Sequence, residues 1–220
     1  KRYHLDVHDF PKARQEFLAR NITGYLELHI EQAPVLESQK QSVACVYGIT
    51  GCERQYITFH SQRTHSGAPI PMRHDAFLAA AEASLAFRDI GLKHDAYCTV
   101  GKVSVAPDIV TISPDTCTIS LDQRSIDPDV LAAIVEEAHA ACLTAAEHNK
   151  VTVSFEPVWS IPPTIFDEHL KELCQAAVKE ETGEPTTMFS GPLHDAAEMA
   201  KIVPFIMMFA MSSRGLSHCK

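Results

Sequence analysis

Histidine and carboxylate side chains alternate along one short segment near the start of the chain. Glu27, His29 and Glu31 occupy every second position, and every second residue of a strand points to the same face. An imidazole between two carboxylates matches a metal-ligating histidine whose partners orient it. The same spacing also fits an edge strand with solvated charges, so both interpretations stay open at this point.

Two other polar segments place a histidine where ligands commonly bind. Residues 211–218 follow an apolar run and end near His218, and ligands of open α/β sheets collect beyond the carboxyl ends of strands. The segment SGPLHD, residues 190–195, carries His194 at a predicted helix start. Backbone N–H groups there favour an anion, and an ordinary capped helix is the alternative.

A loop histidine and a strand-end arginine complete the candidates. His65 lies in a loop rich in Gly and Pro, where its imidazole could polarise a carbonyl oxygen; a solvated turn is the alternative. Arg124 ends a predicted strand and could clamp a substrate carboxylate with two hydrogen bonds. It could equally pair with Asp122 or Asp127.

The elements that position these residues follow from periodicity. Residues 24–32 predict a strand with one apolar and one polar face. Residues 203–210 are continuously apolar, as in a strand buried on both faces. Between them, residues 45–158 predict the order strand, helix, strand, strand, helix, strand. One helix is expected to end at Gly91 and the other to begin after Asp127.

The expected fold class is α/β: a partial catalytic domain, residues 1–42 and 161–220, with an inserted α+β domain, residues 43–160. The insert is expected to be a four-stranded antiparallel sheet with two helices on one face.

Composition narrows the function classes. The net charge is −9, from 19 Lys and Arg against 28 Asp and Glu, without a basic stripe, which argues against a nucleic-acid partner. No run of about 18 apolar residues predicts a membrane span, and no secretory signal is visible. Seven cysteines lie singly with no C-x-x-C pair, which favours reduced thiols and a cytoplasmic location.

Five motifs, taken together, resemble one known family. The segment ELHIEQAPVLE, residues 27–37, closely resembles the ELHIEQGPVLE signature of the amidase/hydantoinase/carbamoylase family. That family includes N-carbamoyl-L-amino-acid hydrolases, β-ureidopropionases and allantoate amidohydrolases, and it belongs with the dinuclear metallohydrolases of the aminoacylase/carboxypeptidase type. The other matches, in family order, are HSG…PMRHDA (65–76), DQR (122–124), SGPLHDA (190–196) and GLSH (215–218).

The resemblance implies a hydrolase of linear amides or ureido compounds, of the N-carbamoyl-L-amino acid or allantoate type, with two divalent metals (Zn, Mn, Co or Ni) that activate a bridging water. His29 resembles a ligand of the first metal and His218 a ligand of the second. His65 resembles the histidine that supports the carbonyl oxygen in the transition state, reaching across a dimer. Residues 43–160 resemble the lid and dimerisation domain, which implies a homodimer. The residues that resemble substrate contacts are Gln32, Thr111, His194 and Arg124, the last for the carboxylate.

Several features depart from the family pattern. Thr111 stands where the family often has Asn, and Ala33, Gln123 and the pair Pro192-Leu193 replace other usual residues. The family also places its remaining metal ligands and its general-base Glu upstream of His29, where this chain has 28 residues. We therefore expect part of a longer enzyme. The alternatives are an inactive lid and dimerisation module, or an aminoacylase or peptidase of the same superfamily.

Overall fold

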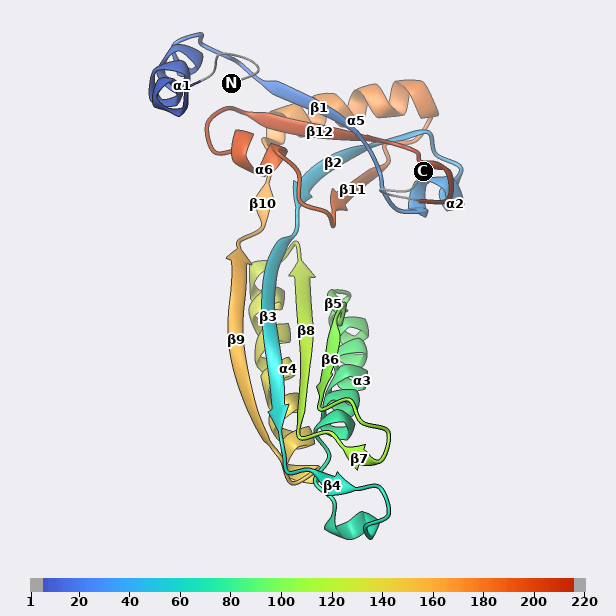
Figure 1. Cartoon of the computed structure of the whole chain (residues 1–220). Helices are drawn as coiled ribbons and strands as arrows, with labels where there is room; N and C mark the ends of the chain where they lie inside the picture. Colours follow the sequence, from blue (N-terminus) through green and yellow to red (C-terminus); the bar gives the residue numbers. More distant parts are fainter. Residues whose placement is uncertain (1–5, 216–220) are drawn as a thin grey trace. The chain divides into compact units, whose positions relative to one another are not determined.

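The structure of the protein is a computed structural model that describes residues 6–215 and divides into two compact units. The first unit consists of two segments, one up to Ile49 and one from Thr164 onward. The second unit is the continuous segment Thr50–Pro163 between them in sequence (Figure 1). The first unit is therefore discontinuous in sequence. The fold class is the expected α/β arrangement with an inserted α+β unit.

The first unit contains one mixed sheet and its flanking helices. Its strands run in the order β1-β12-β2-β10, with β11 beside β2. Its strands are β1 (Tyr25–Ile30), β2 (Val43–Ile49), β10 (Thr164–Ile165), β11 (Thr187–Ser190) and β12 (Phe205–Ala210). Its helices are η1 (Val7–Asp9), α1 (Phe10–Leu18), α2 (Val35–Gln39), α5 (Glu168–Thr182), α6 (Ala196–Met199) and η3 (Ser213–Gly215).

The inserted domain was expected to begin at residue 43, but strand β2 belongs to the first unit, so the second unit begins at Thr50. Strand β2 pairs antiparallel with β12 and parallel with β11, so it belongs to the sheet of the first unit. Ala44, Cys45 and Val46 are fully buried in that unit's core. The apolar run 43–49 is thus a central strand, which a boundary drawn from local patterning alone placed on the wrong side.

Strand β12 has the burial expected of a continuous apolar run, because it lies between β1 and β2. Strand β1 alternates between polar and apolar residues as expected, but its polar side chains are the more buried ones. Glu27 and His29 are half-buried, whereas Leu26, Leu28 and Ile30 are exposed, Leu28 to 66%. The polar face of β1 packs against histidine and phenylalanine rings, and its apolar face is the open one among the residues described.

Helix α5 has a clear structural signal at each of its two ends. The Asp167 carboxylate accepts a hydrogen bond from the N–H of Leu170 and caps the N-terminus. Gly183, at φ 84°, ends the helix in the left-handed conformation that glycine adopts without a steric cost. The helix buries Cys174 and Val178 in the core of the first unit.

The second unit is built on a sheet in which β5 and β6 pair with successive parts of β8, giving the order β5/β6-β8-β3-β9. All of these pairings are antiparallel. Its strands are β3 (Gly51–His60), β4 (Thr64–His65), β5 (Tyr97–Thr99), β6 (Val103–Ala106), β7 (Ile112–Ser113), β8 (Thr116–Ser125) and β9 (Thr152–Ile161). Its helices are η2 (Ile70–Met72), α3 (Ala76–His94) and α4 (Pro128–His148).

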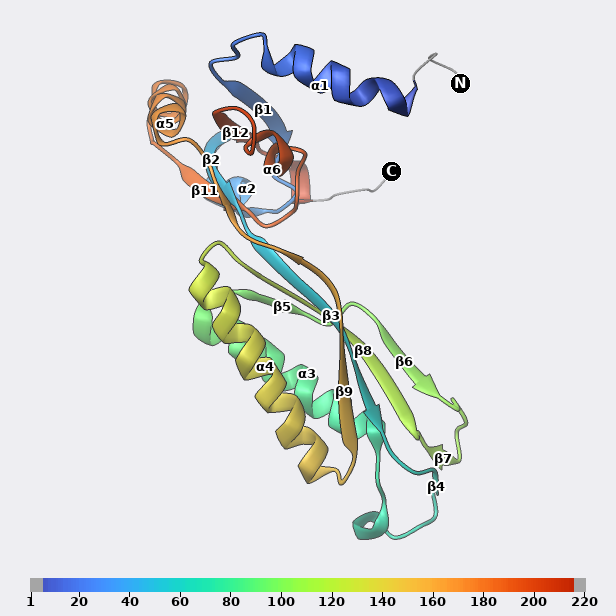
Figure 2. The ribbon, with the colours of Figure 1, turned by 90° about the vertical axis from the view of Figure 1, so that its left-hand side faces the viewer.

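Helices α3 and α4 pack side by side on one face of this sheet (Figure 2). Along β8 every second residue is buried, from Cys117 to Ser125, because those side chains point at the helices. The alternate side chains, such as Thr118 and Asp122, form the opposite face and are half-buried. The sheet therefore has an apolar covered face and a polar face.

The ends of α3 correct one expectation. Asp75 caps its start by accepting hydrogen bonds from the N–H groups of Phe77 and Leu78. Gly91, expected to end the helix, lies inside it, and the helix continues to His94. A Cβ at residue 91 would lie 2.9 Å from the carbonyl oxygen of Ala96, so this glycine permits close packing of the following turn.

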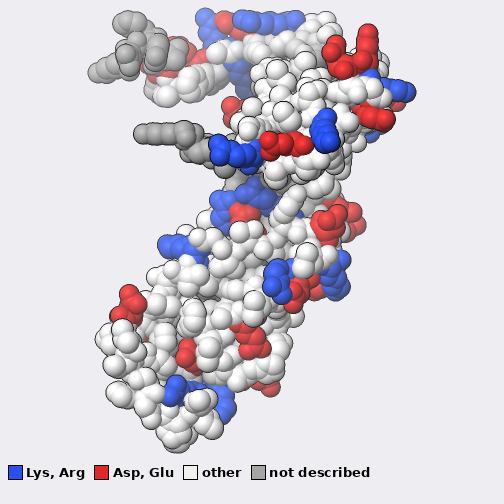
Figure 3. Space-filling view, turned by 90° about the vertical axis from the view of Figure 1, so that its right-hand side faces the viewer, with Lys and Arg blue, Asp and Glu red and all other residues white. Residues whose placement is uncertain are grey.

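No helix in residues 6–215 is both long enough and apolar enough to cross a membrane. Basic and acidic side chains are interspersed over the face shown in Figure 3.

Candidate active site

Strands β1 and β12 are parallel neighbours, so their carboxyl ends lie at the same edge of the sheet. His29 is paired with Phe209 in this register. The turns that follow the two strands also meet. A Cβ at Gly215, where φ is 61°, would come within 2.5 Å of the backbone at Ala33, so only glycine allows this approach. The turn after β1 and the described start of the segment after β12, up to Gly215, are therefore held side by side.

A pair of imidazoles forms the centre of this edge. The ring centroids of His29 and His194 are 4.4 Å apart, in an edge-to-face arrangement. Glu27 lies on the same face of β1, with its Oε1 3.9 Å from Nδ1 of His194. Phe209 contributes the apolar side, at 5.8 Å from the His194 ring. Thus His29 and His194, 165 residues apart in the chain, are brought together.

The tautomer of His194 follows from its hydrogen bonds. The Ser190 hydroxyl donates to the carbonyl of Pro192, so it accepts from Nε2 of His194, at 2.8 Å. The neutral ring then carries its lone pair on Nδ1, toward Glu27. Burial, together with the neighbouring His29, lowers the pKa of His194 to about 4, so this imidazole is neutral near pH 7. Burial raises the pKa of Glu27.

Glu31 and Gln32, which follow His29 in the segment 27–37, differ from it in their surroundings or backbone conformation. Glu31 is buried, and its carboxylate accepts hydrogen bonds from the N–H groups of Val35 and Leu36, at 2.8 and 3.0 Å. It therefore caps α2. The alternation had suggested instead that Glu31 shares the polar face of β1 with His29. Gln32 has a φ of 61°, a conformation that is uncommon for residues other than glycine and often marks functional sites.

His218, the second predicted metal ligand, lies outside the described residues. Among residues 6–215 no group of three or more His, Cys, Asp or Glu side chains is arranged to hold a metal ion. His29 is an imidazole at the edge where ligands collect, so its donor chemistry suits a divalent transition metal.

Arg124 lies in the second unit, on the polar face of the sheet. Its Nε and Nη2 donate to the two carboxylate oxygens of Asp122, at 2.6 and 3.2 Å. Burial alone would raise the pKa of Asp122, but hydrogen bonds from Arg124 and Arg54 outweigh it and lower the pKa. Arg124 therefore does pair with Asp122, one of the two partners suggested by the sequence. Arg54 is a second neighbour of Asp122, which the sequence pattern did not reveal.

His65 and Thr111 are close together in the second unit. His65 lies on the short ribbon formed by β4 and β7, and Thr111 directly precedes β7. The N–H of Ser66 donates to the carbonyl of Thr111 at 2.8 Å. The N–H of Gly67 donates to Nδ1 of His65 at 3.0 Å. The proton of the neutral His65 ring therefore sits on Nε2, which can donate to an oxygen. His65 is exposed.

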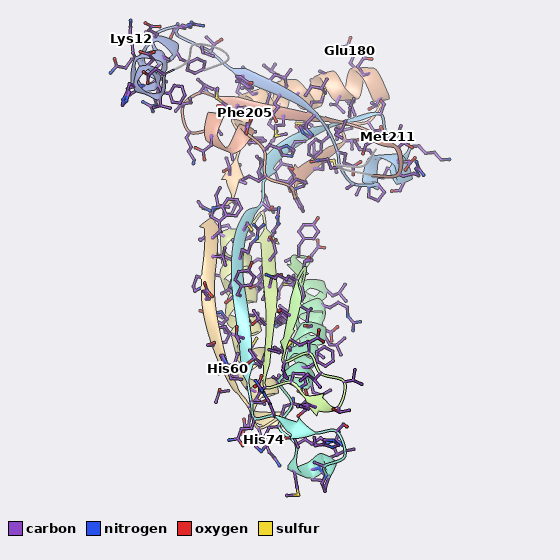
Figure 4. The ribbon with its side chains drawn as sticks, viewed as in Figure 1. Lys12, His60, His74, Glu180, Phe205 and Met211 are labelled. Carbon is purple, nitrogen blue, oxygen red and sulfur yellow. The ribbon has the colours of Figure 1, made fainter. Side chains whose placement is uncertain are left out.

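Arg124 and His65 lie at opposite ends of the second unit's sheet. Arg124 pairs with Cys52 at the start of β3, and the ribbon of His65 follows His60 at its end. Figure 4 labels His60 near that end. Cys52 and His60 lie eight positions apart along β3, which corresponds to more than about 25 Å. One small substrate cannot contact both side chains of the same chain.

Comparisons with known proteins identify the family of the chain. Residues 10–220 match the peptidase family M20/M25/M40. The chain belongs to this family. Members similar to it include the ureidoglycolate hydrolase of Oryza sativa subsp. japonica, 31% identical over 200 residues, and the N-carbamoyl-L-amino acid amidohydrolase of Geobacillus stearothermophilus, 29% identical over 216 residues.

The M20 chain described here spans about half the length of the relatives it matches. It aligns over 89% of its own length with 41% of the rice protein, and over 97% with 52% of the Geobacillus protein. A solved structure of an amidase of the hydantoinase/carbamoylase family from Burkholderia multivorans has a TM-score of 0.85 and 30% identity. That match covers 90% of this chain and 49% of the other.

Proposed function

We propose that this chain forms part of a metal-dependent hydrolase of linear amides and ureido compounds, of the N-carbamoyl-L-amino acid or allantoate type. The observation that carries the proposal is the family match over residues 10–220, together with relatives named for ureidoglycolate and N-carbamoyl-L-amino acid hydrolysis. The paired imidazoles of His29 and His194 at one sheet edge support a site in this part of the protein.

In this proposal His29 and His218 are ligands of two divalent metals (Zn, Mn, Co or Ni). His29 fits that role by its donor chemistry and its place near the carboxyl end of β1. Divalent metals in such sites lower the pKa of bound water so that hydroxide is available near neutral pH. His194, neutral because it is buried, contacts the substrate, and Gln32 contributes an amide from the adjoining turn.

Arg124 is proposed to bind the substrate carboxylate. A guanidinium offers several donors in a fixed plane, and Asp122 holds the Nε edge of this one in place. A side chain held in this way needs little reorganisation when the substrate binds.

His65 is proposed to stabilise the oxyanion that develops on the substrate carbonyl, by donating from Nε2. Thr111, which directly precedes the neighbouring strand β7, is proposed to contact the same substrate. Because His65 and Arg124 lie at opposite ends of one sheet, His65 would act on the site of a second copy. This geometry supports a homodimer formed through the second unit, Thr50–Pro163, with that unit serving as lid and dimerisation domain.

A reducing, cytoplasmic location is part of the proposal. The six cysteines among the described residues are all free thiols, as expected in a reducing compartment.

Metal stoichiometry tests the proposal first. The purified chain is dialysed against a divalent metal, and bound metal is measured by elemental analysis. His29→Asn should lower the bound metal, whereas His169→Asn, at an exposed position on α5, should leave it unchanged. A chain that holds no metal would contradict the ligand assignment and favour the lid and dimerisation module.

A substrate panel tests the reaction class. Ureido compounds, namely N-carbamoyl amino acids and allantoate, should be hydrolysed in preference to N-acyl amino acids. Turnover of acyl amino acids without turnover of ureido compounds would instead support an aminoacylase of the same superfamily.

A further inference from the structure

A charged cluster crosses three neighbouring strands on the polar face of the second unit's sheet. Trp159 of β9, Arg54 of β3 and Asp122 of β8 lie in one row, because Arg54 is the register partner of both. Arg124 lies two residues beyond Asp122 and shares its face. The buried side chains of these strands point the other way, toward α3 and α4.

Asp122 is shared between the two arginines. Arg124 takes both carboxylate oxygens, and Arg54 donates Nε and Nη2 to Oδ2, at 2.9 and 2.5 Å. Arg54 is itself held from the other side, because its guanidinium lies 5.3 Å from the centroid of the Trp159 ring. Each member of the row is therefore fixed by the next, and Arg124 is the last of them.

The charges of this cluster do not balance. Two guanidinium groups face one carboxylate, and the side chains are only 38%, 22% and 24% exposed for Arg54, Asp122 and Arg124. Together the three side chains carry one net positive charge in a partly desolvated place, where an added carboxylate is attracted more strongly than at the open surface.

We propose that Arg54 is a positioning residue for substrate binding: through Asp122 it fixes the guanidinium plane of Arg124, and its own charge leaves the cluster able to accept one carboxylate. This inference rests on the proposed function, in which Arg124 binds the substrate carboxylate. It adds Arg54, Asp122 and Trp159 as the row that sets the geometry and charge of that contact.

The test measures binding of a carboxylate and of its neutral counterpart. Isothermal titration calorimetry on the full chain gives the Kd of N-carbamoylglycine and of N-carbamoylglycinamide. Arg54→Gln should weaken carboxylate binding about tenfold or more, since charge-assisted contacts are lost, and should change amide binding less than twofold. Arg54→Lys keeps the charge without the planar fork, so it should recover only part of the affinity.

Two comparisons separate the possible outcomes. Arg88→Gln, which removes an exposed arginine paired with Asp89 on α3, should leave both Kd values unchanged. Trp159, the single tryptophan of the chain, should change its emission when the carboxylate binds and not when the amide binds. If Arg54→Gln fails to fold, judged by circular dichroism, Arg54→Lys and Asp122→Asn carry the test.

A general loss of structure would weaken carboxylate and amide alike and would overturn the positioning role. Wild-type affinity in Arg54→Gln, with binding abolished in Arg124→Gln, would overturn this inference and leave the proposed function intact. If the wild type does not distinguish the carboxylate from the amide, the role of Arg124 fails, and the role of Arg54 fails with it.

Discussion

The two units of the chain cover their sheets in different ways. In the second unit, α3 and α4 bury a continuous apolar face, and the opposite face carries Ser, Thr and charged side chains. In the first unit, the edge strand β1 turns its polar residues toward His194 and leaves Leu26, Leu28 and Ile30 exposed. The second unit thus has the burial pattern of a self-supporting domain, whereas the first unit keeps an apolar surface open beside its candidate site.

The strongest test of this difference is a cavity in the core of the second unit. Phe87→Ala removes a fully buried ring of α3 and should lower the free energy of unfolding by about 3–5 kcal/mol. Denaturant unfolding followed by Trp159 fluorescence reports on this unit, because the only tryptophan lies there. Leu85→Ala, on the same helix but 60% exposed, should have little effect, and an equal loss there would contradict a helix-covered core.

A smaller effect is expected at the start of α4. The Asp127 carboxylate accepts hydrogen bonds from the N–H groups of Asp129 and Val130, at 2.8 and 3.2 Å. Asp127→Ala should therefore cost about 1 kcal/mol in the same unfolding experiment. Asp129→Ala, which loses only a first-turn charge, should cost a few tenths of that; the reverse order would show that the cap does not define this end of the helix.

Acidification should weaken the second unit through His139. Burial lowers the pKa of this histidine, which packs on Phe155 and hydrogen-bonds to Gln55. The unfolded chain, with an ordinary histidine pKa near 6.5, then binds the proton more readily than the folded chain, so stability falls as the pH drops below about 6.5. Unfolding at pH 7.0 and 5.5 should show a smaller pH difference for His139→Gln than for the wild type, and an unchanged difference would exclude His139 as its source.

A substitution on the exposed apolar face of β1, in the first unit, should change the free energy of unfolding least and self-association most. Leu28→Glu replaces an exposed apolar side chain on an edge strand, so the free energy of unfolding should change by less than about 0.5 kcal/mol. Self-association, measured by analytical ultracentrifugation, should decrease, because apolar edge strands pair with other chains. Leu173→Glu, at an exposed position on α5, serves as the matched control and should leave self-association unchanged.

The sequence predicts most strongly where the cause is local. The α/β class, the start of α4 after Asp127 and the buried run of β12 are confirmed, because caps and apolar periodicity act within a few residues. Gly91 was misplaced because the contact that requires it, with the backbone at Ala96, depends on how the chain turns after α3. Strand β2 was assigned to the wrong unit because only its pairing with β12 and β11 decides its place.

The candidate site shows the same limit. Periodicity found that Glu27 and His29 share a face, but not that this face is the covered one, since that depends on His194, far along the chain. Glu31 was grouped with them by spacing, although its hydrogen bonds cap α2. Arg54 carried no motif of its own, and only the pairing of β3 with β8 places it on Asp122. All the site roles stay predictions: those of His29, Gln32, His65, Thr111, Arg124, His194 and His218.

The discontinuity of the first unit has a consequence during synthesis of the chain. Strand β1 leaves the ribosome before the whole second unit, whereas its parallel partner β12 emerges after it. The second unit is continuous and can fold as soon as it has emerged. Until then β1 lacks β12, its partner among the described residues, and Tyr25 lacks the Phe205 ring on which it finally stacks. The first unit is therefore the part of the protein whose yield depends on translation speed and on chaperones that shield apolar segments.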